Sequence, residues 1–353
     1  MRPAKTIAML ILLASFTACS DKESPAPDGN AATEEIHADT PRYIAAKGGK
    51  IYVSCYNPPS VVRIDTASRK ADAVCCLGNY QPEGLAIAGG KLFVASSWIA
   101  DENGNSLFDN KVYVVDLASF SVAATLEVGL NPQKIRALGD NLLVVNYNGN
   151  YSDIAAGSAI IDATTLTVAQ TGRAMTSMCT SADSVYAYYA PWGATSTDFF
   201  AMSASTLESH PILGNCHVNN TYSIAAIDGD IYLTTGIYNA NGDIYRLAPD
   251  GTTLWSRETG IFTSKVEPAG DGTAYVLNEG SWGSSNASLD RVNLASGEIQ
   301  HDVFATANGR GLGDVAQDVV VYGSKAYVTV SFSNTIEAVN LHDNKSSQII
   351  LGE

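Results

Sequence analysis

Aromatic and amide side chains recur together in the segments that separate the apolar runs of this chain. Tyrosine and tryptophan offer flat faces for stacking, and asparagine supplies a paired hydrogen-bond donor and acceptor. This combination favours the binding of a neutral, polar ligand. For any single tyrosine, filling the base of a loop is an equally good interpretation. The residues predicted to bind ligand are Tyr56, Asn57, Trp98, Tyr147, Asn148, Tyr151, Tyr189, Trp192, Tyr238, Asn239, Trp282 and Arg310.

Residues that indicate catalysis are few. A Ser-His-Asp system needs an oriented histidine. His217 is the one candidate histidine near the aromatic and amide segments, and no acid is placed to orient it. No nucleophile, phosphate-binding loop or metal triad is specified. We therefore predict no catalytic residue, no bound metal and no cofactor, and a function that is not enzymatic.

Residues 101–109 place oxygen-bearing side chains at alternating positions, as calcium-binding loops do. The segment departs from the EF-hand loop because its glycine comes one place early and Val112 stands where the bidentate acid belongs. We expect a solvated, turn-rich loop, and calcium binding is the alternative.

The elements that must position these residues follow from an internal repeat. Seven times, one or two small residues precede a short apolar strand with an aromatic residue or a leucine at its centre. The mean spacing is about 46 residues, within the range of blade-forming repeats. So short a unit cannot bury both faces of a sheet, and its neighbours must cover them. The centres are Tyr52, Phe93, Leu143, Tyr186, Tyr232, Tyr275 and Tyr327.

Each repeat contains four predicted strands. In the second repeat they lie at residues 83–87, 91–96, 111–116 and 121–128, and aspartate or asparagine commonly starts the turn after a third strand. No segment has a convincing helical period. The sequence therefore predicts an all-β fold, a seven-bladed β-propeller of four-stranded antiparallel blades over residues 41–353. Closure would rest on packing between the first and last blades rather than on a shared sheet.

Propeller topology sorts the connections by face. Connections from second to third strands, and from each fourth strand to the next first strand, lie on one face and carry the predicted ligand-binding residues. The turns between first and second strands are short and lie opposite. Innermost strands carry four charged residues that we expect at the mouth of the central channel: Glu83, Lys134, Lys265 and Asp318.

Residues 1–18 are typical of a signal peptide. Arg2 and Lys5 precede an apolar run at residues 7–13, which is too short to span a bilayer. Small residues then lead to Cys19, in a pattern that resembles a bacterial lipobox, so Cys19 is the predicted site of lipidation. Ordinary secretory cleavage near Ala18 is the alternative. Residues 19–40 are polar and without apolar periodicity, and we predict a flexible tether.

The chain has a formal net charge of −15 and no basic run, which disfavours nucleic acid as a partner. Five cysteines follow Cys19, and an odd number leaves at least one unpaired. No spacing specifies a disulfide, and small buried apolar thiols are the favoured interpretation. These cysteines are Cys55, Cys75, Cys76, Cys179 and Cys216.

The segments GGKLFVASSW and GGKIYVSCYNPPSVVRIDTASRK resemble the surface-layer or YncE-like propellers, whose hallmark is a Tyr-Val strand after a glycine-rich turn. The resemblance covers nearly all of residues 41–353. Together with the lipobox, the acidic residues after Cys19 and the segment GNYQPEGLAI, it extends to propeller lipoproteins of gut Bacteroidetes. Among these, the BtuG type captures vitamin B12 at the cell surface and passes it to an outer-membrane TonB-dependent transporter.

This resemblance implies a lipid-anchored protein at the outer membrane, facing the cell exterior, that holds a corrinoid across one propeller face. Related lipoproteins belong to glycan-uptake loci, and aromatic platforms with asparagine suit sugars equally well. A glycan-binding or adhesive propeller is therefore the alternative, and a propeller lyase centred on His217 is a third hypothesis.

Overall fold

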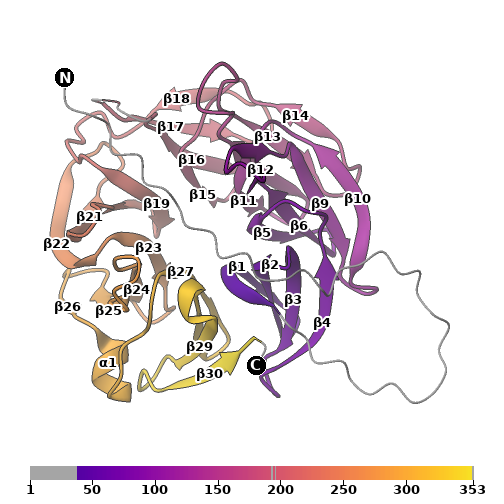
Figure 1. Cartoon of the computed structure of the whole chain (residues 1–353). Coiled ribbons are helices and arrows are strands. Elements are labelled where there is room, and N and C mark those ends of the chain that lie inside the picture. Colours follow the sequence, from indigo (N-terminus) through magenta and orange to yellow (C-terminus); the bar gives the residue numbers. More distant parts are fainter. Residues whose placement is uncertain (1–37, 192–193, 195, 352–353) are drawn as a thin grey trace, which may run out of the picture. The chain divides into compact units, whose positions relative to one another are not determined.

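The computed structural model describes residues 38–191, 194 and 196–351. In this part of the chain the strands form seven four-stranded sheets, each ordered so that consecutive strands are neighbours. The sheets are arranged radially, like the blades of a propeller (Figure 1). The prediction of an all-β, seven-bladed propeller with antiparallel four-stranded blades is confirmed.

The innermost position of each blade is taken by its first strand. These are β1 (Asp39–Lys47), β5 (Pro82–Ala88), β11 (Pro132–Leu138), β15 (Ser177–Ser181), β19 (Thr221–Ile227), β23 (Thr263–Pro268) and β27 (Ala316–Tyr322). The second strands are β2 (Lys50–Asn57), β6 (Lys91–Ser96), β12 (Leu142–Tyr147), β16 (Ser184–Tyr189), β20 (Asp230–Thr235), β24 (Thr273–Asn278) and β28 (Lys325–Val330).

The outer half of each blade consists of its third and fourth strands. The third strands are β3 (Ser60–Asp65), β9 (Lys111–Asp116), β13 (Gly157–Asp162), β17 (Asp198–Ser203), β21 (Asn241–Leu247), β25 (Ser288–Asn293) and β29 (Thr335–Asn340). The fourth strands are β4 (Lys70–Cys76), β10 (Ser121–Glu127), β14 (Val168–Gln170), β18 (Ser209–Pro211), β22 (Thr253–Ile261), β26 (Ile299–Gln300) and β30 (Ser346–Ile350).

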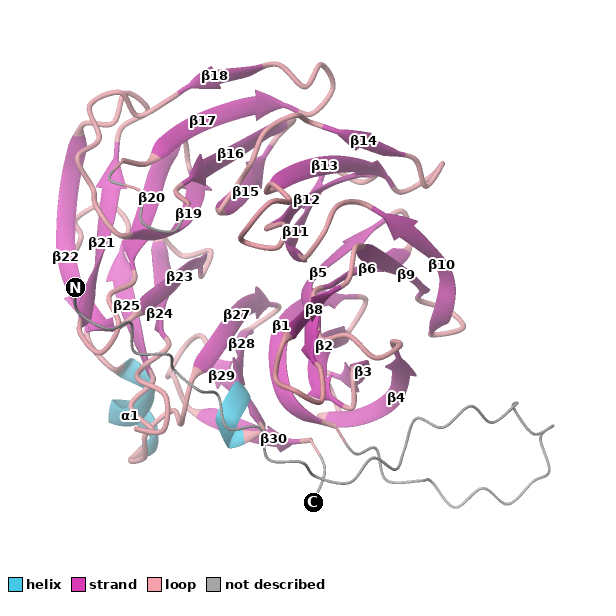
Figure 2. Ribbon diagram, turned by 45° about the horizontal axis from the view of Figure 1, so that its top comes forward, coloured by secondary structure: helices cyan, strands magenta, loops and turns pink. Residues whose placement is uncertain are grey.

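Three short elements lie in the connections. The long connection of the second blade contains a hairpin of β7 (Trp98–Ala100) and β8 (Ser106–Phe108). Helix α1 (Val303–Asn308) and the 3-10 turn η1 (Ser331–Ser333) lie in connections of the last two blades (Figure 2). Helix α1 has only six residues, which is too few to produce a recognisable helical period in the sequence.

The predicted turns are present after the third strands. Asp65 accepts hydrogen bonds from the backbone N–H groups of Ala67 and Ser68, and Asp116 and Asp162 repeat this arrangement in the next two blades. A short acidic side chain thus satisfies the backbone of each turn locally. These turns fix the register between the third and fourth strands.

The core consists of the surfaces between blades. Among the described residues, buried apolar side chains form seven clusters, and each cluster joins two adjacent blades. In five of the seven clusters a second-strand centre is the largest buried member: Phe93 and Tyr275 are fully buried, and Tyr52, Tyr232 and Tyr327 nearly so. The repeated strand core is therefore a packing device, as its period predicts.

Blades 1 and 7 close the ring without sharing a sheet. One apolar cluster joins them, and it includes Val53 from β2 and Ile336 from β29. Several hydrogen bonds support it. The Ser331 hydroxyl donates to the Pro41 carbonyl at 2.6 Å, and the Gly49 N–H donates to the Tyr322 hydroxyl at 2.7 Å. Another runs from the Ile44 N–H to Asp318 Oδ2 at 3.2 Å. Closure by packing is as the sequence indicated.

Two leucines of neighbouring blades test the role of these clusters. Leu143 is fully buried between the second and third blades, whereas Leu107 is 47% exposed on β8. We expect Leu143→Ala to lower the free energy of unfolding by about 2–5 kcal/mol, since it opens a cavity between blades. We expect Leu107→Ala to change it by less than about 0.5 kcal/mol. Urea unfolding followed by circular dichroism measures both, and equal losses would contradict this assignment of the core.

Candidate ligand-binding site

Antiparallel blades divide the connections between two faces. Each first strand begins at the end of the blade where the second strand meets the third, and the fourth strand returns to that same end. We call this side the loop face and the opposite side, with its tight turns between first and second strands, the hairpin face.

Exposed apolar side chains are concentrated on the loop face. Of eleven large apolar residues that are exposed in the described part of the chain, four lie on outermost strands: Val74, Val122, Leu254 and Ile350. The other seven all lie in connections between second and third strands: Leu107, Tyr151, Ile154, Ile237, Tyr238, Trp282 and Phe332. A concentration of this kind on one face of a protein is typical of an interaction surface.

Several predicted ligand-binding residues belong to this exposed set. Tyr151 is 70% exposed, Tyr238 is 65% exposed and Trp282 is 53% exposed. Trp282 stands beside Phe332 of the next blade, with ring centroids 6.0 Å apart. The Tyr151 hydroxyl accepts a hydrogen bond from the amide of Asn148 at 3.2 Å. Asn239 is exposed next to Tyr238. The loop face therefore presents aromatic rings with amide groups close by.

Tyr147 has a packing role in the structure. A Cβ atom added at Gly129 would lie 2.6 Å from its ring, and one added at Gly157 would clash with its hydroxyl. The hydroxyl also donates to the Gln170 side chain at 2.7 Å. The ring fills space that two glycines leave, which is the loop-base alternative that the sequence left open.

Arg310 is held by its own blade. Its guanidinium donates to Glu337 Oε2 at 2.8 Å and lies over the ring of Phe304, 4.9 Å from the centroid. Glu337 is fully buried and also accepts from the side chains of Ser346 and Gln348. Removal of Arg310 would leave a buried carboxylate short of a partner, so Arg310 has a structural function here.

The remaining predicted residues differ in exposure. Trp98 and Tyr189 are half-buried, and Tyr189 packs against the cluster between blades 3 and 4. Asn57 is exposed, and its amide donates to Asp39 Oδ2 at 3.1 Å. Trp192 and Cys19 lie outside the described residues.

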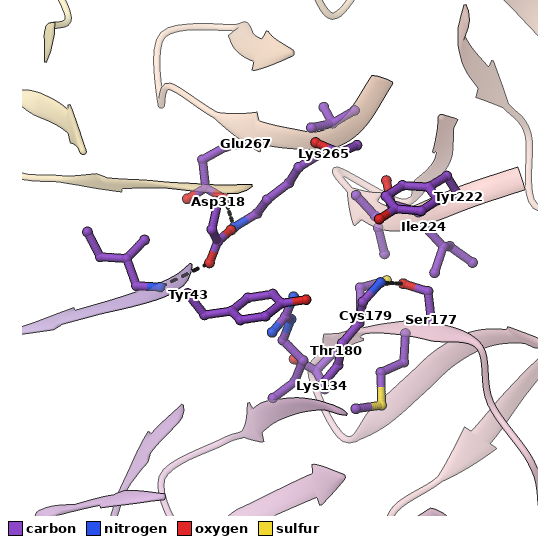
Figure 3. Close-up of a pocket in the computed structure, with 18 of the residues that line it drawn as sticks. Tyr43, Lys134, Ser177, Cys179, Thr180, Tyr222, Ile224, Lys265, Glu267 and Asp318 are labelled. Carbon is purple, nitrogen blue, oxygen red and sulfur yellow. Dashed lines mark hydrogen bonds and ion pairs between the residues drawn. The ribbon is translucent and has the colours of Figure 1, made fainter. Parts of the chain in front are cut away.

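The central channel contains a cavity of about 340 Å³ lined by the first strands. Tyr43, Lys134, Tyr222, Lys265 and Asp318 project toward it from five different strands (Figure 3). Lys134, Lys265 and Asp318 are three of the four residues that the sequence placed on innermost strands at the channel. The fourth, Glu83, is on β5 and is almost completely buried.

Glu83 is the centre of a polar cluster between blades 1 and 2. The hydroxyl of Tyr56 donates to it, and the Arg42 guanidinium lies 3.7 Å from its second oxygen. Arg42 also lies over the Tyr56 ring, 4.8 Å from the centroid, and donates to Gln317 of blade 7. Burial raises the pKa of Glu83, and Arg42 and Tyr56 oppose that rise. Tyr56 therefore packs against side chains of the innermost strands β1 and β5 rather than pointing outward.

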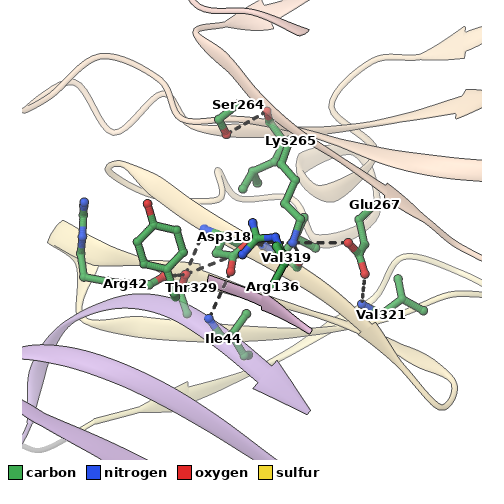
Figure 4. A network of polar contacts seen from close by, with 12 residues as sticks. Arg42, Ile44, Arg136, Ser264, Lys265, Glu267, Asp318, Val319, Val321 and Thr329 are labelled. Atoms are coloured by element: carbon green, nitrogen blue, oxygen red, sulfur yellow. Dashed lines mark hydrogen bonds and ion pairs between the residues drawn. The ribbon is translucent and has the colours of Figure 1, made fainter. Parts of the chain in front are cut away.

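A second cluster joins blades 6 and 7 (Figure 4). The Lys265 ammonium lies 2.8 Å from Asp318 Oδ1 and 3.3 Å from Glu267. Burial alone would lower the pKa of Lys265, but the two carboxylates outweigh it and raise the pKa. Glu267 also accepts from the Val321 N–H, and Asp318 from the Ile44 N–H. This cluster links three blades at the channel wall.

Two further ionisable groups line the cavity without an ion pair among the described residues. Glu279 accepts a hydrogen bond from the Tyr222 hydroxyl at 3.2 Å, and burial raises its pKa to about 7. Lys134 donates to the Ser177 hydroxyl at 2.9 Å, and burial, with Arg136 nearby, lowers its pKa to about 8. Both groups thus titrate close to neutral pH.

Sequence reasoning missed four residues that line the cavity: Tyr43, Arg136, Tyr222 and Glu279. It also missed Arg42 of β1, the partner of Glu83. A signal was present for Arg136, because it lies two positions after Lys134, and alternate residues of a strand share a side. Arg42 and Tyr43 lie just after the expected start of the propeller, whereas β1 begins at Asp39. Tyr222 and Glu279 approach each other from different blades, and no spacing within one repeat indicates that contact.

The other predicted features have local explanations. Asp101 accepts hydrogen bonds from the backbone N–H groups of Asn103 and Asn105 and from the Asn105 amide, so the turn itself uses this carboxylate. His217 is exposed. No three His, Cys, Asp or Glu side chains gather as a metal site within the described residues. Four free thiols are buried or half-buried: Cys55, Cys75, Cys179 and Cys216. Cys76 is exposed and disulfide-bonded, so the expectation of a small buried thiol is wrong at this position.

No helix in the described ranges has the length and apolar character needed to cross a membrane.

Comparisons with known proteins give the class of fold. Neither a protein-family model nor a curated protein matches the chain. The β-propeller domain of Cps50 (Swd1) from Myceliophteria thermophila is similar, with a TM-score of 0.56 at 11% identity, covering 88% of this chain and 96% of that one. Hydrazine synthase of Kuenenia stuttgartiensis aligns with a TM-score of 0.45 at 12% identity, covering 90% of this chain and 80% of that one. The chain is a seven-bladed β-propeller, and the likeness extends to the fold alone.

Two tyrosines on the loop side test the channel cluster. Tyr56→Phe removes a hydrogen bond to the buried Glu83, and we expect it to lower the free energy of unfolding by about 1–3 kcal/mol. Tyr238→Phe alters only an exposed hydroxyl and serves as the matched control, with a change below about 0.5 kcal/mol. Urea unfolding at neutral pH measures both, and an unchanged Tyr56→Phe variant would refute the assigned contact.

Glu279 makes stability depend on pH. Its pKa is about 7 in the folded protein against an ordinary value of 4.5, so the folded state holds the proton more tightly. The contribution of protonated Glu279 to the free energy of unfolding is therefore fully present below about pH 4.5, and it is lost as the pH rises to about 7. We expect Glu279→Gln to exceed the wild type in stability at about pH 8 by up to about 3 kcal/mol, and to match it near pH 4.5. Urea unfolding at the two pH values measures this, and a variant less stable at the higher pH would contradict it.

Proposed function

We propose that this protein is a cell-surface, lipid-anchored propeller that captures a corrinoid on its loop face and passes it to an outer-membrane TonB-dependent transporter. The proposal describes binding rather than catalysis. The signal peptide, Cys19 and the polar segment after it support export and anchoring, and these residues lie outside the described part of the chain.

The observation that carries the proposal is the distribution of exposed apolar residues. All seven that are not on outermost strands lie in connections of the loop face. Exposed tyrosine and tryptophan give large contact areas at low entropic cost, and neighbouring amides provide donors and acceptors for a polar ligand. A broad, neutral-to-polar ligand such as a corrinoid matches this chemistry.

The size of the ligand also favours the loop face over the channel. The channel cavity has a volume of about 340 Å³, at the lower end of the range for small-molecule sites. A corrinoid is too large for it and would lie across the connections of several blades. The exposed residues Tyr151, Tyr238 and Trp282 belong to blades 3, 5 and 6, so a ligand of that breadth could contact more than one of them.

A glycan is the alternative ligand, and one arrangement favours it. Trp282 and Phe332 present adjacent rings from neighbouring blades, which could stack against successive sugar units. A glycan-binding or adhesive function would use the same exposed residues of the loop face. Assays with cyanocobalamin and with polysaccharides distinguish corrinoid capture from glycan binding.

Substitution of two exposed aromatics tests the site. We expect the double variant Tyr238→Ala and Trp282→Ala to bind cyanocobalamin at least about tenfold more weakly than the wild type, because interface aromatics dominate binding energy. Its melting temperature should stay nearly unchanged, since both rings are exposed. Leu254→Ala, on an outermost strand and 49% exposed, is the matched control and should bind as the wild type does.

Isothermal titration calorimetry measures these affinities, and gel filtration of the mixture would give a coloured protein peak. No heat with cyanocobalamin, together with retention in polysaccharide affinity gels, would replace the corrinoid by a glycan. The absence of both signals would refute ligand capture by the loop face. Turnover of a glycan that is abolished by His217→Ala would support the lyase hypothesis instead.

A further inference from the structure

Two cations on one strand line the central cavity. Lys134 and Arg136 are two positions apart on β11, and both border the cavity of about 340 Å³. Neither forms an ion pair with any residue that the structure describes. The Lys134 ammonium contacts the Ser177 hydroxyl at 2.9 Å and lies 5.5 Å from the centroid of the Tyr222 ring. Arg136 donates to the carbonyl of Ile135 at 3.0 Å.

The other cations of the channel differ in this respect. Arg42 has Glu83 as its partner, and Lys265 has Asp318 and Glu267. The carboxylates of the channel are therefore largely engaged by cations other than those of β11. Both side chains are half-buried. A charge withdrawn from water without a counter-charge is costly, so Lys134 and Arg136 constitute an unbalanced positive site in a chain whose net charge is −15.

One carboxyl group borders the cavity without a cationic partner. Glu279 accepts from Tyr222, and its pKa of about 7 means that near neutral pH it carries only part of its charge. It lies beyond ion-pair distance of Lys134, although the two groups influence each other electrostatically. The positive charge of Arg136 has the opposite effect to that of Glu279. It helps to lower the pKa of Lys134, and it partly offsets the carboxylates that raise the pKa of Lys265.

Hydroxyl groups face the same space. The side chain of Tyr43 extends toward the centre of the cavity (Figure 3). No hydrogen bond joins its hydroxyl to another described residue. Ser177 lies on β15, the innermost strand of the next blade, and its hydroxyl accepts a hydrogen bond from Lys134. Donors from three blades thus converge on one region of the channel, and such convergence of donors is what an oxyanion requires.

We propose that the central channel binds a small oxyanion, a carboxylate or a phosphate group, between Lys134 and Arg136, with the hydroxyls of Tyr43 and Ser177 as further donors. This site is separate from the ligand surface of the loop face. The arginine supplies planar, paired donors that match either oxyanion, and the lysine supplies a compact charge. The bound anion would give both cations the counter-charge that the protein does not provide.

Thermal unfolding of the purified protein tests the proposal. Inorganic phosphate and acetate, each at about 10 mM, are compared with sodium chloride of equal ionic strength. Binding to the folded state raises the melting temperature, and we expect a shift of about 3 °C or more for at least one oxyanion. A shift with phosphate only assigns a phosphate group, a shift with acetate only assigns a carboxylate, and a shift with both assigns a general oxyanion site.

Two variants and a control locate the effect. Lys134→Met and Arg136→Gln should each abolish the shift. Lys134→Met should also melt no lower than the wild type in chloride, because it removes an unpaired, half-buried charge. Lys70→Met, which removes an exposed lysine of β4, should retain the full shift. The proposal is overturned if neither oxyanion stabilises the wild type, or if Arg136→Gln and Lys70→Met respond equally.

Discussion

The packing of each blade against its two neighbours is the constraint on which the rest of this structure depends. A four-stranded blade has two apolar faces and no core of its own, so burial is complete only when the ring closes. The seven inter-blade clusters, with that between blades 7 and 1 among them, satisfy this condition. Closure brings seven first strands to the channel and directs the two kinds of connection to opposite faces. Both proposed binding regions therefore follow from one packing requirement.

The two regions differ in chemistry because the propeller supports them differently. Loop-face side chains such as Tyr238 and Trp282 extend from connections into solvent, where substitution costs little stability. Channel side chains come from the innermost strands and are buried or half-buried, so a partner stabilises each charge there. Arg42 with Glu83, and Lys265 with Asp318, meet that need within the protein. Lys134 and Arg136 do not meet it among the described residues. This difference is the basis for proposing a small anion in the channel and a broad, neutral ligand on the loop face.

The fold could be predicted from the sequence because its signals are local and repeated. The Tyr-Val strand cores, the Asp65 and Asp116 turns and the four strands of the second blade all depend on residues close in sequence, and the structure contains them. Side-chain roles could be predicted less well, because they depend on contacts between blades. The spacing of Tyr147 gave no sign that Gly129 and Gly157 leave room for its ring. Arg42 contacts Gln317, 275 positions away, and only ring closure brings the two together.

Hydrogen–deuterium exchange with and without cyanocobalamin tests the central claim, capture by the loop face, most directly. The account predicts slower exchange in the connections of the loop face, at residues 148–156, 236–240 and 279–287, and no change in the turns of the hairpin face, at residues 47–50, 88–91 and 322–325. Protection confined to the hairpin face, or equal exchange with and without the ligand at saturating concentration, would contradict it.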